Sequence, residues 1–161
     1  MKAIADERLS DAVLAYVSAA GPVQEALQQV LTQAAGFALM IMLRRGQAAL
    51  CAGPLELARD RMREIADNAR ALRRPSDAAH HRHHLDAAVE ALTQTLDTAA
   101  LCLKPAAGDI EREMLAGRLS AATDHLRATA RILPGFDWVD LSQSCCAAHA
   151  PGQTFSCAEA A

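Results

Sequence analysis

The chain has 161 residues, of which 52% are apolar and only 3% aromatic, and its formal net charge is −3. This length suits one domain, and its core must be built from leucine, isoleucine, valine, methionine and alanine. The mild negative charge argues against nucleic acid and anionic membrane surfaces as partners, because both require a basic footprint. We therefore expect neither as a partner.

The N-terminal part of the chain predicts a first helix and then a longer, more apolar one. Apolar residues recur every three or four positions from Leu9 to Ala20, and Gly21-Pro22 is a common signal for one helix ending and the next beginning. The second helix is expected over residues 22–45. Its run AAGFALMIML is about half of the roughly 20 residues that a bilayer span requires. It predicts a buried central helix, with a membrane-associated segment as the alternative.

Three more helices are expected. Their apolar stripes run over residues 55–72, 85–103 and 115–133. Gly53-Pro54 begins the first of them, and Ser76 and Asp109 are placed to cap the other two. We therefore predict an all-α, up-and-down helical bundle of four main helices plus the N-terminal helix.

The domain is expected over residues 1–133, followed by an irregular, cysteine-containing C-terminal tail over 134–161. Gly, Pro, Ser and Cys dominate this tail, which also carries the single tryptophan of the chain. It is expected to pack over the bundle through Phe136, Trp138 and Leu141, or to be partly disordered.

The stretch DAAHHRHHLDAA (77–88) places four histidines at the start of a predicted helix. His80 and His84 are one turn apart, and neutral imidazoles at that spacing can converge on one divalent transition metal such as zinc. Asp77, one turn earlier, is the candidate third ligand. The alternative interpretation is a solvated polar face, with His81 packed and hydrogen-bonded at the end of the core.

A second metal hypothesis concerns the tail. Cys145, Cys146, His149 and Cys157 offer three thiolates and one imidazole, the donor types of a tetrahedral zinc site. The spacing does not favour it, because adjacent cysteines rarely chelate one ion and no C-x-x-C pair is present. Cysteines without a structural role are the competing interpretation.

The five cysteines and the lack of an apolar leader predict a reducing, cytoplasmic setting with free thiols. Arginine far outnumbers lysine and alanine is abundant, which indicates a GC-rich bacterial genome.

The sequence contains no motif of nucleophilic catalysis, phosphate binding or diiron binding. The stretch TDHLRATARIL (123–133) is similar to the phosphoaccepting histidine helix of sensor kinases, but Asp124 precedes His125 instead of following it. We therefore expect a non-enzymatic helical interaction module, homodimeric or bound to another protein. One alternative is a metal-binding or metal-sensing protein that uses the histidines or the tail thiols. A second alternative is an enzyme or small-ligand-binding bundle with an interhelical pocket.

Overall fold

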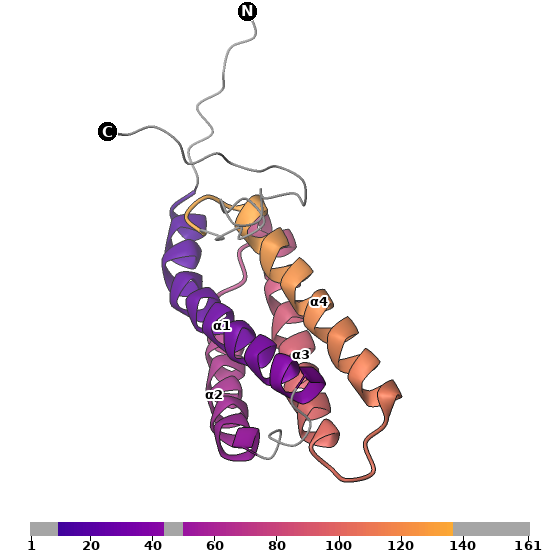
Figure 1. Cartoon of the computed structure of the whole chain (residues 1–161). Coiled ribbons are helices and arrows are strands. Elements are labelled where there is room, and N and C mark those ends of the chain that lie inside the picture. Colours follow the sequence, from indigo (N-terminus) through magenta and orange to yellow (C-terminus); the bar gives the residue numbers. More distant parts are fainter. Residues whose placement is uncertain (1–9, 44–49, 137–161) are drawn as a thin grey trace, which may run out of the picture.

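The computed structural model describes residues 10–43 and 50–136, and within them the fold is all-α, with no strand. The four helices are α1 (Asp11–Leu43), α2 (Ala52–Ala71), α3 (Ala79–Cys102) and α4 (Asp109–Ile132), and a short 3-10 turn, η2 (Ser76–Ala78), precedes α3. The helices run alternately up and down along one bundle (Figure 1). The predicted all-α, up-and-down bundle is therefore confirmed.

The first two predicted helices are one continuous helix. Gly21-Pro22 does not end a helix, because α1 passes through Pro22 without a break. The separate N-terminal helix is thus a wrong prediction, and its residues form the first third of α1. Figure 1 shows α1 running along the bundle as a single rod.

Burial on one face explains why α1 continues through a proline. Tyr16 and Ala20 before Pro22, and Val23 and Leu27 after it, belong to one buried stripe. A proline inside a helix costs about 3 kcal/mol, whereas each large apolar side chain that leaves water contributes about 1.5–3 kcal/mol. Pro22 itself is exposed, so its ring and the missing N–H face solvent.

We expect Pro22→Ala to stabilise the protein by about 2 kcal/mol. Alanine restores an N–H that can bond to the Ser18 carbonyl, and the gain is reduced by the greater freedom of the unfolded chain. Urea unfolding followed by circular dichroism, at a fixed protein concentration, measures the change. Pro54→Ala is the matched control. Pro54 lies in the first turn of α2, where the N–H has no helical partner, so little change is expected. A loss of stability in Pro22→Ala would contradict a continuous α1.

Two predicted caps also differ. Ser76 lies in the 3-10 turn η2 rather than at the start of α3, whose N-cap is Ala78. Asp109 is the first residue of α4, and the cap before it is Gly108, whose N–H donates to Glu111 Oε2 at 2.7 Å. The carboxylate three residues into the helix thus satisfies the backbone at its start.

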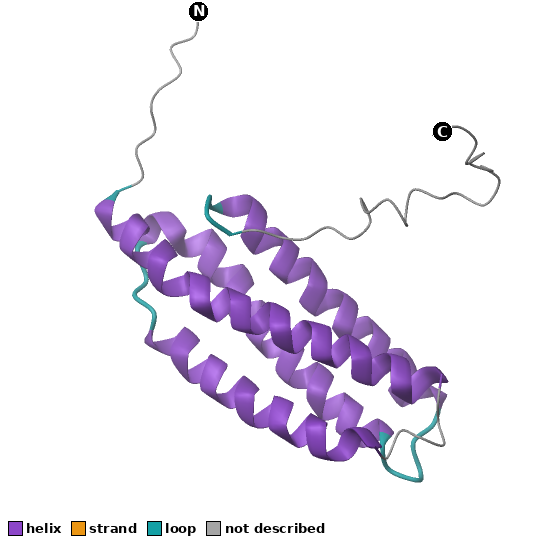
Figure 2. Ribbon diagram, turned by 60° about the vertical axis from the view of Figure 1, so that its left-hand side comes forward, coloured by secondary structure: helices purple, strands orange, loops and turns teal. Residues whose placement is uncertain are grey.

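The core is aliphatic, as the composition predicted. α3 lies at its centre, because it packs against α1, α2 and α4. The helix predicted over residues 22–45 is therefore not the buried central one, and its end exposes Leu39 and Leu43. The largest fully buried side chains of α3 are leucines, and small alanines between them let the neighbouring helices approach closely. Figure 2 shows that the α3–α4 loop lies at the same end of the bundle as the end of α1 and the start of α2.

Candidate functional site

At the opposite end of the bundle, His81 of α3 is packed inside the core. Its side chain is fully buried, and the Tyr16 hydroxyl of α1 lies 2.9 Å from His81 Nδ1. The Phe136 ring stacks on the imidazole, with ring centroids 4.3 Å apart. The prediction that His81 packs and is hydrogen-bonded at the end of the core is confirmed. Of the other tail residues expected to pack, Trp138 and Leu141 lie outside the described residues.

Burial determines the protonation states of His81 and Tyr16. It lowers the pKa of His81 to about 4, with a further lowering from His84, and it raises the pKa of Tyr16 to about 12. The Tyr16 hydroxyl therefore keeps its proton, and His81 is a neutral imidazole that can accept a hydrogen bond at Nδ1. His81 Nε2 is buried and has no hydrogen-bond partner among the described residues. The arrangement is suited to holding α1, α3 and the segment after α4 together.

Next to His81, two histidines of different helices meet. His84 Nδ1 on α3 lies 3.0 Å from His125 Nδ1 on α4, and both side chains are partly exposed. Burial lowers the pKa of His84, and the neighbouring His125, His80 and His83 lower it further. Because each neutral imidazole has one N–H, the contact requires one ring to donate at Nδ1 and the other to accept. This contact between helices was not predicted in the sequence analysis.

The predicted metal ligands of the histidine cluster are only partly brought together. The His80 and His84 rings lie edge to face, with centroids 5.0 Å apart, and the His83 and His84 ring centroids are 5.3 Å apart. Asp77 lies in η2, where it accepts a hydrogen bond from the Ser76 hydroxyl at 3.0 Å. Where the structure places them, no three His, Cys, Asp or Glu side chains within residues 10–43 and 50–136 are grouped so that they could hold a metal ion.

The second predicted metal site falls outside the described residues. This applies to all four of its candidate ligands, Cys145, Cys146, His149 and Cys157. The two cysteines that the structure does describe, Cys51 and Cys102, are free and buried. Burial is also the main cause that raises the pKa of the Cys102 thiol. Both residues therefore serve as small core side chains rather than as reactive thiols.

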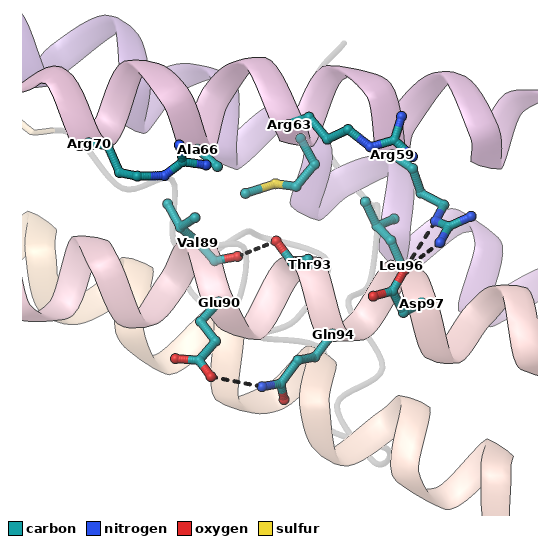
Figure 3. Close-up of a pocket in the computed structure, with 11 residues that line it drawn as sticks. Arg59, Arg63, Ala66, Arg70, Val89, Glu90, Thr93, Gln94, Leu96 and Asp97 are labelled. Carbon is teal, nitrogen blue, oxygen red and sulfur yellow. Dashed lines mark hydrogen bonds and ion pairs between the residues drawn. The ribbon is translucent and has the colours of Figure 1, made fainter.

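A cleft of about 630 Å³ lies between α2 and α3 (Figure 3). Apolar side chains of both helices form part of its lining, among them Met62 and Leu96. Arginines of α2 lie on one side, and Glu90, Gln94 and Asp97 of α3 lie on the other, as Figure 3 shows. This cleft is of the size that small-ligand sites occupy, and it is the kind of feature that the interhelical-pocket hypothesis requires.

The arginines of α2 are occupied by acidic partners. Arg59 bridges the two helices, donating from Nη2 and Nε to Asp97 Oδ1 at 2.7 and 3.1 Å, and it also pairs with Glu56. Arg63 pairs with Asp60. Each remaining pair links residues three apart on the exposed face of α2, namely Arg61 with Glu64 and Arg70 with Asp67. The positive charges are thus balanced locally, so the cleft does not present a concentrated basic surface to an anion.

These features define the class of the protein as a single four-helix, up-and-down bundle with an aliphatic core and a histidine cluster between α3 and α4. No family model, no curated protein and no solved structure matches the chain. The function is therefore argued from the surface and the side chains of this chain alone.

Proposed function

We propose that this chain is a non-enzymatic, cytoplasmic interaction module that forms a homodimer through one apolar end of its helical bundle. The observation that carries the proposal is where the exposed large apolar side chains lie. Eight of the nine that are exposed among the described residues lie at the end where α1 and α3 finish and α2 and α4 begin. The apolar end consists of Leu39, Met42, Leu43, Leu50, Leu57, Leu101, Ile110 and Met114.

All four helices contribute to the apolar end, since each of these residues lies within about two turns of a helix terminus. The exposure is large: Leu43 is 73% exposed, and Leu57 and Ile110 are each 72% exposed. A groove of about 530 Å³ between α1 and α2 extends this surface, and it is lined by Phe37, Met40 and other apolar side chains. Exposed apolar side chains gathered at one end of a domain are typical of a surface that binds a partner.

The charges around the apolar end favour a second copy of the chain as the partner. Arg59 pairs with Glu56 and Arg112 with Asp109, and exposed Lys104 and Glu113 add one charge of each sign. Among the described residues, this end therefore offers apolar contacts with charges of both signs, which do not select a partner of one charge. A second copy of the same surface matches it in a two-fold dimer, which is the commonest symmetric assembly. The free, buried thiols of Cys51 and Cys102 fit the reducing cytoplasm.

A lipid surface is the competing occupant. α1 is the one helix of the described residues whose length and composition fit a membrane span, with a mean hydropathy of 1.4. The same helix contributes Tyr16, Leu27 and Ile41 to the core, where they are almost fully buried. Part of α1 is therefore buried in the bundle, but only 28% of its most apolar window is, so binding to a lipid surface is an outcome that the test must distinguish.

The test is the molar mass of the full chain by light scattering on a size-exclusion column, over a range of concentrations. We expect the wild type to be dimeric and the double variant Leu57→Glu/Ile110→Glu to be monomeric. Two buried leucine-sized contacts are worth about 3 kcal/mol or more, so the dimer Kd should rise at least about 100-fold. Because both side chains are largely exposed in the single chain, the fold should be retained.

Leu14→Glu is the matched control. Leu14 is 49% exposed and lies at the other end of α1, so this variant should remain dimeric. A wild type that is monomeric at about 100 μM, or a Leu14→Glu variant that dissociates like the double variant, would overturn the proposal. Sedimentation of a monomeric wild type with phosphatidylcholine vesicles would also overturn it, in favour of the lipid surface.

A further inference from the structure

We propose that His84 of α3 and His125 of α4 form the two fixed ligands of a site for a divalent transition metal ion, with His80 as the third ligand. The site would join two helices, and it differs from the single-helix set of Asp77, His80 and His84 that the sequence predicts. It lies at the end of the bundle away from the apolar end, and it does not depend on the proposed dimer.

The distance between the two imidazole nitrogens fits a shared metal ion. His84 Nδ1 and His125 Nδ1 are 3.0 Å apart. Two imidazole nitrogens that bind one zinc ion at about 2.0–2.1 Å are separated by about 3.3 Å in a tetrahedral site and about 2.9 Å at a right angle. The observed separation lies between these values, so the two nitrogens already stand at the spacing that one ion requires. Imidazole is a ligand suited to zinc, copper and nickel.

The imidazole protons can be arranged so that both Nδ1 atoms are free to bind a metal ion. In the absence of a metal ion, the His84–His125 contact needs one ring protonated at Nδ1 and the other at Nε2. When both neutral rings carry their proton on Nε2, each Nδ1 has a lone pair, and both lone pairs are available to an ion between the rings. A divalent cation there replaces the shared proton, and the displaced proton moves to Nε2 of its own ring. The charge of the ligands does not change.

Two packed helices support the ligands, and a further donor lies nearby. α3 packs more extensively against α4 than against any other helix, and the two run side by side (Figure 1). A site built across two packed helices holds its ligands more closely than one built on a loop. The His80 ring lies beside His84, with centroids 5.0 Å apart, and because it is exposed it can turn toward the ion by a change of rotamer. Water completes the coordination.

The experiment is zinc titration of the full chain by calorimetry at neutral pH, with Cys145→Ser, Cys146→Ser and Cys157→Ser introduced so that the tail thiols do not bind the ion. We expect one zinc ion per chain. His84→Gln and His125→Gln should each weaken binding by at least about tenfold, which is the loss seen when only an outer partner of a metal ligand is removed. Gln keeps hydrogen-bonding capacity, and circular dichroism checks that each variant folds.

Asp77→Asn and His83→Gln are the controls, and both should change the zinc affinity by less than about twofold, since neither residue belongs to the proposed ligand set. Imidazole resonances of His84 and His125 should shift together on addition of zinc. No zinc binding in the background that lacks the three tail cysteines, or binding that is lost in Asp77→Asn but retained in His125→Gln, would overturn the proposal. Equal affinity of the His125→Gln variant and the parent protein would do the same.

Discussion

Leu92→Ala is expected to lower the free energy of unfolding by about 2–5 kcal/mol, the range observed when a buried leucine is truncated in a packed core. Leu92 is fully buried on α3, the helix that packs against the other three. Removing its side chain leaves a cavity that helices on several sides cannot all move to fill. Urea unfolding of the full chain at fixed concentration, followed by circular dichroism at neutral pH, measures the loss.

Leu14→Ala is the matched control for this variant, because Leu14 is 49% exposed and lies away from both the core and the apolar end. A change within about 0.5 kcal/mol is expected there, as for most surface substitutions. If the two variants lost the same small amount of stability, α3 would not lie at the centre of the core.

Much of this fold follows from the spacing of apolar residues. The stripe over 55–72 predicted the buried face of α2, where Leu55, Met62 and Ile65 are each almost fully buried. The same spacing predicted the buried leucines of α3 and α4. Helical periodicity is decisive here because no segment carries a competing strand pattern and the core contains few aromatic side chains to disturb it.

Gly-Pro pairs and capping residues predicted the ends of the helices less reliably than the apolar spacing predicted the helices themselves. Gly21-Pro22 indicates a helix end in isolation, but the buried stripe continues through it with unchanged spacing, and burial outweighs the local cost. Ser76 was misplaced by two residues and Asp109 by one, because a short 3-10 turn precedes α3 and the Glu111 carboxylate satisfies the backbone at the start of α4. Element boundaries depend on such tertiary details more than element type does.

In the histidine cluster, the position of a side chain on its helix could be predicted, but not every partner from a distant segment. The packing of His81 could be predicted from its place near the apolar stripe, but its partner Tyr16 could not, since they are 65 residues apart. The meeting of His84 and His125 had a usable signal. His84 lies 18 residues before the end of α3, and His125 lies 16 residues after the start of α4. When two antiparallel helices are joined by a short loop, these two positions lie at nearly the same level along the bundle axis.

Acidification is the second perturbation expected to have a large effect. The pKa of buried His81 is lowered from 6.5 to about 4, so between these values the unfolded chain binds a proton that the folded chain excludes. The resulting stability is fully present above pH 6.5 and is lost as the pH falls toward 4. Relative to pH 7.5, His81 alone should cost about 2 kcal/mol at pH 5 and about 3 kcal/mol at pH 4. Urea unfolding at each pH, with a chelator present, measures this loss.

The double variant Tyr16→Phe/His81→Leu separates His81 from the other groups that titrate in this range. His84, whose pKa is also lowered, and the Arg82–Asp86 ion pair near Tyr16 remain in place in this variant. Removing both members of the hydrogen-bonded pair avoids leaving one buried polar group without its partner. Between pH 7.5 and 5, the double variant should therefore lose about 2 kcal/mol less than the wild type. Tyr16→Phe alone should keep the full pH dependence, because burial is the main cause of the lowered His81 pKa. Identical pH profiles for the wild type and the double variant would show that His81 is not excluded from protonation by the folded core.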